Sequence, residues 1–338
     1  MTITVDLEKN RYHIPIVRGG LHKANTWLKL DRKVLIVTDS GVPAPYAQAV
    51  AACCACPVTV TVPQGEDSKN IQNFEMLLRT MLTHHFTRTD CVVAVGGGVV
   101  GDLAGFAAAS FLRGIDFYNI PTTVLSQVDS SVGGKVAINL DSIKNCVGAF
   151  YQPKAVLIDP EVLTTLPARQ IANGLAEAVK MALTFDEKLL ALFEQGDPLS
   201  QIDSIIASCL QIKAAVVQQD EKEAGLRRVL NFGHTIGHGI ETVKMGSLYH
   251  GECVALGMLP MCAEPLRPRV KAILEKLNLP TACQIDAEAV WAAIHHDKKL
   301  SGDTITVVYA PKAGSYELRS MPLAELKQTV LAYLGKKE

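Results

Sequence analysis

The sequence predicts an α/β N-terminal half built on a parallel, non-standard Rossmann-like sheet, followed by a mostly α-helical C-terminal half. Two observations support this. Short β-type segments alternate with helical stretches through the first half, as in a parallel sheet. From about Pro160 the hydrophobic pattern becomes almost entirely helical. We therefore expect two domains, at 1–159 and 160–338, with ligands bound at the interface between them.

The expected elements follow in chain order. Two strands are expected at 2–7 and 12–17, around a turn at 8–11. Further β segments, separated by helical stretches, are expected at 33–38, 58–62, 91–95 and 116–120. In the second half we expect helices at 169–194, 199–220, 233–243, 251–260, 267–277, 287–296 and 323–334, with a small β pair at 304–309 and 315–319.

The composition is that of a globular, enzyme-sized protein. Of the 338 residues, 48% are hydrophobic and 20% are charged, which is enough for two domains with separate cores. A net charge of −1 and a pI near 6.8 give no overall attraction to nucleic acid or to an acidic membrane surface. Apolar runs are shorter than the ~18 residues that span a bilayer. Any affinity for an anion must therefore be local.

Cysteine usage indicates a reducing compartment. The cysteine count of nine is odd, and the N-terminus lacks the pattern of a secretory signal, so we expect free thiols in the cytoplasm. Cys53, Cys54 and Cys56 lie in an apolar run, without a second pair at zinc-finger spacing. We expect them to pack in the core rather than to bind a metal.

The segment from Leu230 to Glu252 contains the residue types of a metal site. His234 and His238 are four apart, so they share one face of a helix, and His250 follows after a turn-like stretch. A carboxylate could come from nearby or from Glu177. Two or three imidazoles with one carboxylate and an open position are typical of catalytic zinc. The alternative is an ordinary helix with surface or capping histidines, but Gly233, Gly237 and Gly239 indicate that something approaches this helix closely.

A glycine-rich loop in the first half fits a phosphate-binding turn. The strand at 91–95 runs into Gly96-Gly97-Gly98-Val99-Val100-Gly101, which matches G-x-G-x-x-G at a strand-to-helix junction. The usual ribose-binding acid about 20 residues later is missing. Acids follow earlier strands instead, as Asp39 and within 63–69. The sequence therefore indicates a nucleotide site of non-standard layout, or a glycine-rich turn without a ligand.

Cations would suit a phosphorylated, carboxylated substrate. The segment 121–135 ends in serines, glycines and Lys135, and Lys144-Asn145 follow. Lys180 lies one helical turn after Glu177 and shares its face. Arg227 lies one turn before Asn231, and Lys213, Lys298 and Lys299 add further charge. Each of these could be an ordinary solvated cation, although the positions of Lys180 and Arg227 favour a role at the site.

Together these segments resemble the 3-dehydroquinate synthase family, within the sugar-phosphate cyclases. The matching segments appear in family order over nearly the whole chain. Gly239 stands where alanine is usual, and Ser126 is a second mild departure. The segments are TDS (38–40), QGEDSK (64–69), GGGVVGDLAGF (96–106), RG (113–114), PTTVLSQVDSSVGGK (121–135), KN (144–145), GLAEAVK (174–180), LNFGHTIGHGIE (230–241), HGE (250–252) and DKK (297–299).

The resemblance implies roles for individual residues, with the 1–159 domain binding NAD and the 160–338 domain binding metal and substrate. The implied metal ligands are Glu177, His234 and His250, which leaves His238 as a proton relay. NAD would lie along Asp39, Glu66, Lys69, Gly97, Gly98, Val99, Val100, Gly101, Asp102, Thr122, Thr123, Lys135, Lys144 and Thr165. Substrate would contact Arg113, Asp129, Lys135, Asn145, Lys180, Lys213, Arg227, Asn231, His238 and Lys299, of which Asp129, Lys135, Lys180, Asn231 and His238 would be catalytic.

The resemblance also implies the reaction. The family converts 3-deoxy-D-arabino-heptulosonate 7-phosphate to 3-dehydroquinate and orthophosphate in the shikimate pathway, with transient oxidation by NAD, phosphate elimination, re-reduction and an intramolecular aldol closure. Zinc is the expected metal, with cobalt as an alternative. A cytoplasmic homodimer without nucleic-acid or membrane partners is expected.

Two alternatives differ in their substrate. A metal-dependent polyol dehydrogenase of the glycerol dehydrogenase type shares the glycine loop and the metal ligands, but its uncharged substrate has little use for the cations. A cyclase acting on another sugar phosphate, or a nucleotide-binding protein without catalysis, is the second. Arg227, Asn231 and His238 favour the carboxylated heptulosonate, and the three metal ligands favour catalysis.

Overall fold

The structure, a computed structural model, describes residues 1–8, 10–141, 143–296 and 302–335. The chain divides into two compact units, which we describe separately. Unit 1 comprises Met1–Pro167 and Lys213–Lys222, and unit 2 comprises Ala168–Ile212 and Glu223–Glu338. Helix α6 (Ile202–Gln219) contributes residues to both.

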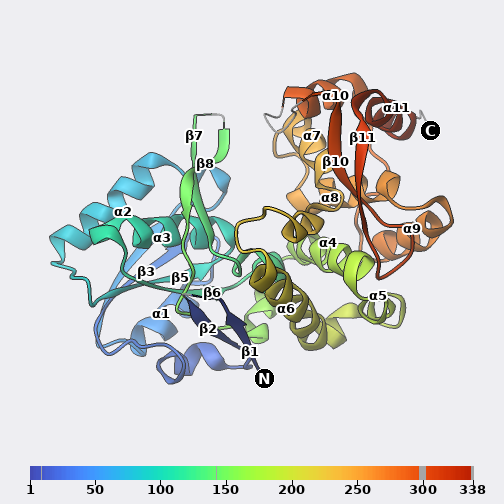
Figure 1. The fold of residues 1–338 in the computed structure, drawn as a ribbon. Coiled ribbons are helices and arrows are strands. Elements are labelled where there is room, and N and C mark those ends of the chain that lie inside the picture. The colour runs from blue at the N-terminus through green and yellow to red at the C-terminus, as the bar shows by residue number, and fades with distance from the viewer. Residues whose placement is uncertain (9, 142, 297–301, 336–338) are drawn as a thin grey trace. The chain divides into compact units, whose positions relative to one another are not determined.

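Unit 1 is built on a seven-stranded sheet whose central strands are parallel (Figure 1). The strand order is β1-β2-β9-β6-β5-β3-β4, and only the β1–β2 pair is antiparallel. The elements are β1 (Thr2–Asp6), β2 (Arg11–Pro15), β3 (Lys33–Asp39), α1 (Ala44–Ala52), β4 (Cys56–Val62), α2 (Ile71–Thr83), β5 (Cys91–Gly96), α3 (Gly98–Ser110), β6 (Asp116–Pro121), β7 (Lys135–Leu140), β8 (Ile143–Phe150) and β9 (Ala155–Val156).

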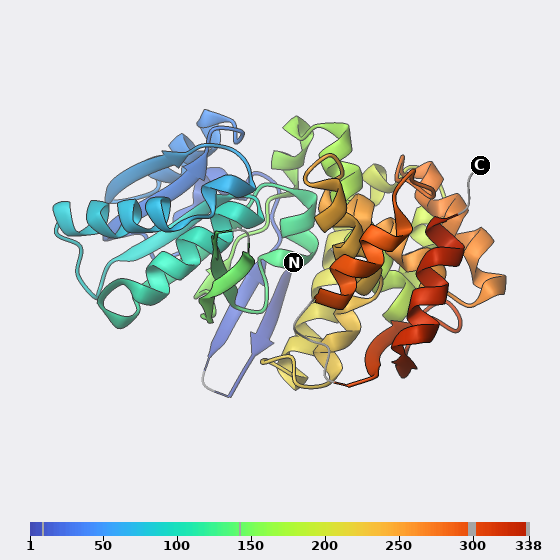
Figure 2. The same ribbon diagram turned by 90° about the horizontal axis from the view of Figure 1, so that it is seen from above.

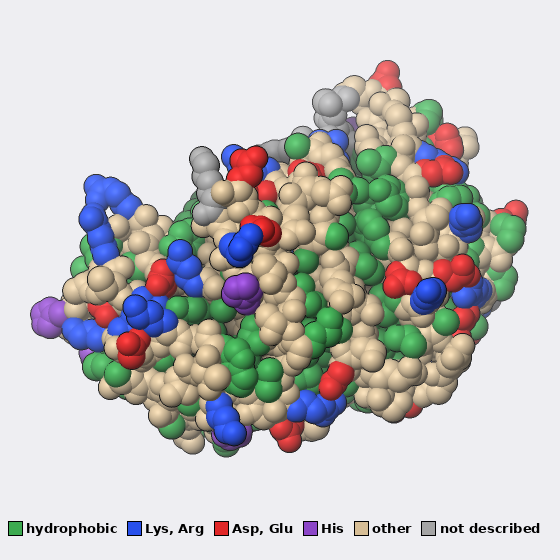
Figure 3. All heavy atoms as spheres, turned by 60° about the horizontal axis from the view of Figure 1, so that its bottom comes forward, with side chains coloured by type: hydrophobic (Ala, Val, Ile, Leu, Met, Phe, Trp, Pro, Cys, Tyr) green, Lys and Arg blue, Asp and Glu red, His purple; other side chains and the backbone are tan. Residues whose placement is uncertain are grey.

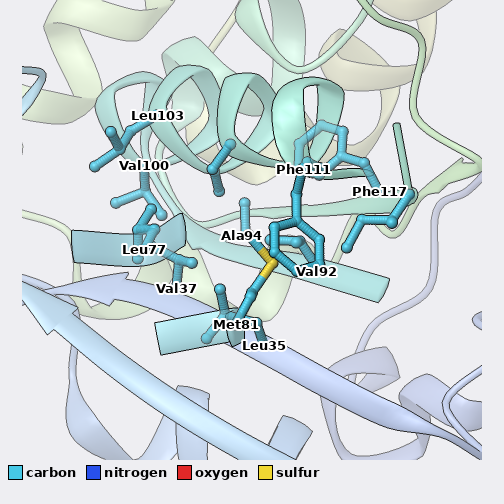
Figure 4. Packing of buried hydrophobic residues seen from close by; sticks show 14 of the residues in the cluster. Leu35, Val37, Leu77, Met81, Val92, Ala94, Val100, Leu103, Phe111 and Phe117 are labelled. Atoms are coloured by element: carbon cyan, nitrogen blue, oxygen red, sulfur yellow. The ribbon is translucent and has the colours of Figure 1, made fainter. Parts of the chain in front are cut away.

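The central strands β3, β5 and β6 are buried on both faces of the sheet, which explains the continuous apolar runs of β3 and β5. Because side chains alternate along a strand, Leu35 and Val37 of β3 point to one core while Val34 and Ile36 point to the other. Helices α2 and α3 cover the first core (Figure 4), and α1 covers the second. The two helices α2 and α3 lie side by side (Figure 2), where Phe74 and Phe106 stack with ring centroids 4.7 Å apart.

Unit 2 is mostly helical, with one small antiparallel hairpin, β10–β11. The α/β first half and helical second half expected from the sequence are thus confirmed. Besides its part of α6, unit 2 contains α4 (Ala168–Phe185), α5 (Glu187–Glu194), α7 (His234–Lys244), α8 (His250–Met258), α9 (Arg267–Lys276), α10 (Ala287–His296), β10 (Thr304–Tyr309), β11 (Glu317–Pro322) and α11 (Leu323–Leu334).

Two details differ from expectation. The single helix expected at 169–194 is broken, because Asp186 ends α4 and caps α5 by accepting hydrogen bonds from the N–H groups of Lys188 and Leu189. The β7–β8 hairpin, which contacts α3, was not expected. Seven of the eight residues of β8 are exposed, so the strand has no alternating apolar pattern.

The distribution of surface charges and the state of the cysteines agree with what the composition indicates. On the face drawn in Figure 3, lysine and arginine side chains are interspersed with aspartate and glutamate. Within the described ranges, no helix is both long and apolar enough to cross a membrane. Cys53 and Cys54 pack against the core under α1, as expected, whereas Cys56 is exposed. All nine cysteines are free thiols.

Candidate active site

Three helices of unit 2 bring Glu177, His234 and His250 together. Glu177 is fully buried in α4, His234 is the first residue of α7, and His250 is the first residue of α8. The Nε2 atoms of His234 and His250 lie 3.6 and 3.3 Å from Glu177 Oε1. One donor atom from each of the three residues lies within 4.8 Å of the others. One carboxylate oxygen and two imidazole nitrogens therefore converge on one point, although Glu177 and His234 are 57 residues apart in the sequence.

The second nitrogen of each imidazole is engaged outside the cluster. His234 Nδ1 lies 3.0 Å from the carbonyl oxygen of Phe232, and His250 Nδ1 lies 3.0 Å from Glu241 Oε2. Both acceptors require a proton on Nδ1, so Nε2 is the nitrogen that each ring would offer to a metal. Histidine ligands of metals are normally held in this way by a carbonyl or carboxylate. The residues present therefore fit a divalent cation of the zinc type.

Glycines allow the three helices to approach closely enough. A Cβ added at Gly251 of α8 would lie 2.0 Å from the carbonyl oxygen of Asn173 in α4. At Gly257 it would lie 2.1 Å from the carbonyl oxygen of Gly233, which is the N-cap of α7. Both distances are far below ordinary contact, so α8 can lie against α4 and α7 only with glycine at these positions.

Burial and neighbouring charges set the ionisation of the cluster. Burial lowers the pKa of His234 to about 3, so this imidazole is neutral, as a ligand must be. Burial alone would raise the pKa of Glu177, but Lys180 and the histidines hold it well below its usual range. Burial also opposes the charge on His250, yet Glu177 and Glu241 raise its pKa to about 9. Metal binding would therefore release the His250 proton.

His238 lies beside this cluster, one turn along α7. Its ring centroid is 5.2 Å from that of His234 and 5.8 Å from that of His250. His238, Glu241 and His250 form a second group whose donor atoms lie within 4.8 Å, but it is more exposed and lacks the buried carboxylate. The geometry favours the Glu177 group, because there each imidazole presents Nε2.

Unit 2 also holds three of the predicted charged and polar site residues. Lys180 is almost completely buried and forms an ion pair with Glu177 one helical turn away. Arg227 is also buried, in the short 3₁₀ helix Leu226–Asn231 that leads into α7. Asn231 donates from Nδ2 to Glu223 Oε1 over 2.5 Å. Buried cations are uncommon in proteins, so Lys180 and Arg227 are not ordinary surface charges.

In unit 1 the glycine loop lies where the chain order in the sheet reverses. The chain runs from β3 to β4 on one side and then to β5 on the other, so the carboxyl ends of β3 and β5 flank a switch point, where α/β sheets bind ligands. Asp39 ends β3, and Gly97, the N-cap of α3, follows β5. An acid from the earlier strand β3, Asp39, can therefore lie beside the glycine loop that follows β5. A Cβ on Gly97 would lie 3.1 Å from the Thr123 side chain, which is closer than ordinary van der Waals contact.

An ion-pair network lies beside this loop. Lys69 Nζ is 3.0 Å from Asp102 Oδ2 and 3.2 Å from Glu66 Oε1. Burial lowers the pKa of Lys69, but the two carboxylates outweigh it and raise the pKa. Burial raises the pKa of Asp102 to about 6 despite Lys69. Three predicted cofactor residues are thus brought together, one of them in the first turns of α3.

The other predicted residues are more dispersed. Asp129 and Lys213 form an ion pair of 2.6 Å, both in unit 1. The Thr165 hydroxyl lies 2.9 Å from that of Tyr46. Thr122, buried after β6, donates its N–H to the carbonyl of Gly96. Lys135, Lys144, Asn145 and Arg113 are exposed in unit 1, and Lys298 and Lys299 lie outside the described residues.

Two further residues, Glu241 and Asn139, contact predicted site residues but are not themselves among the predicted ones. Glu241 holds His250 Nδ1, and its presence among the glutamates near the histidines was the available signal. Asn139 contacts both Glu66 and the backbone of Asn145. No motif or spacing pointed to Asn139, because the hairpin that carries it has no recognisable pattern.

Comparisons with known proteins show the family of the chain. Residues 59–173 match the 3-dehydroquinate synthase N-terminal family, and residues 174–300 match the 3-dehydroquinate synthase C-terminal family. A protein of Enterococcus faecalis named 3-dehydroquinate synthase is 40% identical over 349 residues, covering 97% of this chain and 98% of its own. A protein of Sulfurimonas denitrificans with the same name is 42% identical over 327 residues, covering 91% and 92%.

A solved structure shares the whole fold. A 2-deoxy-scyllo-inosose synthase, complexed with carbaglucose-6-phosphate, NAD+ and Co2+, superposes with a TM-score of 0.88 at 25% identity. The match covers 99% of this chain and 100% of that one. With both family matches and these relatives spanning nearly its whole length, the chain belongs to the 3-dehydroquinate synthase family.

Proposed function

We propose that this chain is a phosphate-eliminating lyase that converts 3-deoxy-D-arabino-heptulosonate 7-phosphate to 3-dehydroquinate and orthophosphate. The observation that carries the proposal is the convergence of Glu177, His234 and His250 in a chain of this family. The relatives named 3-dehydroquinate synthase support the same reaction. Buried Arg227 and Lys180 support an anionic substrate over the uncharged substrate of a polyol dehydrogenase.

Glu177 Oε1, His234 Nε2 and His250 Nε2 would hold a divalent metal. A bound Zn2+ or Co2+ would supply Lewis acidity, lowering the pKa of a substrate hydroxyl. The 2-deoxy-scyllo-inosose synthase structure with Co2+, and a 2-epi-5-epi-valiolone synthase of Streptomyces hygroscopicus with Zn2+ bound (25% identity, TM-score 0.87, covering 97% of this chain and 98% of that one), support either ion. Glu241 and the Phe232 carbonyl would each hold the proton of Nδ1 and orient the ring, so that Nε2 is the nitrogen offered to the metal.

NAD would lie at the carboxyl ends of β3, β5 and β6. The cofactor would supply a reversible hydride acceptor, so the overall reaction has no net redox change. The N–H groups at the start of α3 would bind the pyrophosphate, because Gly97 leaves them accessible. Asp39, with the Glu66–Lys69–Asp102 network, would bind the remaining polar groups. Structures of both related cyclases with NAD+ support this cofactor.

The chain's own side chains would then position the substrate and move protons. His238 is exposed beside the ligand histidines, where an imidazole can take the proton of a substrate hydroxyl. Arg227 offers a planar pair of donors suited to the substrate carboxylate, with Asn231 as a further donor. The other candidate cations would stabilise negative charge on departing phosphate. Lys180 keeps Glu177 ionised, which maintains the carboxylate ligand.

Phosphate release with trace NAD tests the proposal. The full chain, loaded with zinc, is mixed with the heptulosonate phosphate and NAD far below the substrate concentration. We expect orthophosphate in many-fold excess over NAD, with only a small constant absorbance from NADH. NADH formed in step with substrate consumption would instead identify a dehydrogenase.

A further inference from the structure

A large bulge in the β7–β8 hairpin lies opposite Asn139. The two strands pair regularly from Lys135↔Phe150 to Ile138↔Val147, and the next pair is Leu140↔Ile143. Only Asn139 lies between these pairs on β7, whereas three residues, 144–146, lie between them on β8. Bulges interrupt the ladder and redirect side chains, often beside active sites. Here the bulge contains Lys144 and Asn145, both predicted site residues.

The polar groups of Asn139 turn away from the hairpin ladder. Its backbone N–H donates to the carbonyl oxygen of Lys69 over 2.7 Å. Its side-chain Nδ2 donates to Glu66 Oε1 over 2.8 Å, and its Oδ1 accepts the backbone N–H of Asn145, also over 2.8 Å. One side chain therefore joins the Glu66–Lys69 segment to the bulge. The amide supplies both the donor and the acceptor, whereas a carboxylate lacks the donor and an aliphatic side chain lacks both groups.

The bond to Asn145 acts on a residue of unusual conformation. Asn145 has φ of 54°, in the left-handed region that non-glycine residues seldom adopt. Asparagine tolerates this region, but the surrounding structure must favour it. A hydrogen bond from Asn139 Oδ1 fixes the Asn145 N–H and thus the direction in which the bulge presents its side chains.

We propose that Asn139 is a positioning residue that couples the cofactor-binding segment Glu66–Lys69 to the bulge carrying Lys144 and Asn145. This inference rests on the proposed function, which places NAD on one side of the Asn139 amide and substrate on the other. Asn139 acts through Glu66 and Asn145 rather than by contact with either ligand. The effects of its two bonds can be distinguished, because Asn139→Asp removes only the bond to Glu66 whereas Asn139→Ala removes both.

Two substitutions of Asn139 separate these effects. Asn139→Asp keeps the acceptor for Asn145 but sets a carboxylate against Glu66, so NAD affinity should fall by about 10- to 150-fold with a smaller change in kcat. Asn139→Ala removes both bonds, so NAD affinity should fall and kcat should fall as well. NAD binding is measured by calorimetry on the zinc-loaded chain, and kcat and KM by phosphate release. Thermal unfolding of each variant reports folding; if Asn139→Asp does not fold, Asn139→Ala carries the test.

A reversed bond tests for rescue. In the double variant Asn139→Asp/Glu66→Gln, the new amide at 66 can donate to the new carboxylate at 139, so NAD should bind at least about 3-fold more tightly than to Asn139→Asp alone. Leu140→Ala, at an exposed neighbouring position, is the control for general damage to the hairpin. Wild-type NAD affinity in both Asn139 variants, an equal loss in Leu140→Ala, or no rescue would each overturn the inference.

The NAD measurement also separates this inference from the proposed reaction. If the unsubstituted chain binds NAD but releases no phosphate, while the Asn139 variants still lose NAD affinity and the double variant recovers it, the reaction is wrong and the coupling to Glu66 stands. If the chain releases phosphate and the Asn139 variants behave as wild type, the reaction stands and the role of Asn139 is refuted. Failure of the unsubstituted chain to bind NAD would overturn both.

Discussion

Gly257→Ala should empty the metal site although Gly257 contacts no ligand. The added Cβ would lie 2.1 Å from the carbonyl oxygen of Gly233 and 2.8 Å from the backbone nitrogen of Gly237. Both atoms belong to the start of α7, where His234 is the first helical residue. Backbone atoms cannot rotate away as a side chain can, so α7 and α8 must separate.

The size of this separation follows from the contact distance. Ordinary van der Waals contact begins near 3.4 Å, so the helices must move apart by about 1.3 Å at this point. Zinc–nitrogen bonds are about 2.0–2.1 Å long and tolerate errors of about 0.2 Å, so His234 and His250 could no longer share an ion. Disturbing ligand orientation alone costs about 10- to 100-fold in metal affinity, and we expect a loss of at least about 100-fold. Overpacking should also cost about 1–3 kcal/mol of stability, partly offset by the better helix propensity of alanine, about 1 kcal/mol.

Gly239→Ala is the matched control, because it is the same substitution in a neighbouring helix. Its Cβ would meet Ile294 Cγ1 at 2.7 Å and the Val290 carbonyl oxygen at 3.1 Å, both in α10, so the substitution would displace α10 rather than α8. Zinc content and zinc affinity, from competition with a chelating dye, are measured for both variants. We expect near-normal binding in Gly239→Ala only. Normal zinc affinity in Gly257→Ala would refute the argument that helix separation sets the ligand geometry.

Three further substitutions test individual side chains. His234→Ala should empty the metal site, whereas His238→Ala should retain zinc and slow turnover by roughly 10²–10⁴-fold; equal zinc loss in both would show that the ligand assignment is wrong. Arg227→Lys should lower kcat/KM by about 10- to 150-fold, the cost of a charge-assisted contact, with NAD and zinc binding unchanged; a normal kcat/KM would remove the two-pronged role of the guanidinium. Glu241→Gln should weaken zinc binding by about 10- to 100-fold, because His250 Nδ1 loses its carboxylate; unchanged affinity measured by dye competition would contradict this.

The order of the helices and strands could be predicted because buried apolar residues recur in the sequence in a pattern typical of each type of element. Strand β3 is buried on both faces, so its residues Val34–Val37 form an unbroken apolar run, and the strand ends in an acid, Asp39. Strand β8 has no such apolar pattern, since it is exposed at all but one position. The end of α4 was missed for a different reason. Asp186 stops one helix and caps the next within an apolar pattern that continues through both.

The candidate site was predictable only in part, because its residues meet through long-range packing. The spacing of His234 and His238 predicts a shared helix face, but spacing cannot show which of them faces a carboxylate in another helix. Glu177 lies in α4, and its distance of 3.6 Å from His234 Nε2 depends on how α4, α7 and α8 pack. The hydrogen bonds of Asn139 depend in the same way on a bulge that no local sequence pattern predicts.

The glycines beside the histidines show how a local signal can be correct while its cause is distant. The sequence indicated that something approaches the helix closely at Gly233, Gly237 and Gly239. In the structure the first two face the backbone of α8, and Gly239 faces α10. What approaches these glycines is therefore the protein itself, the backbone of α8 at Gly233 and Gly237 and residues of α10 at Gly239. Because Gly233 and Gly237 let α7 lie this close to α8, the rings of His234 and His250 can come within 5.2 Å of each other, so these two glycines set the helix spacing that the proposed ligands require.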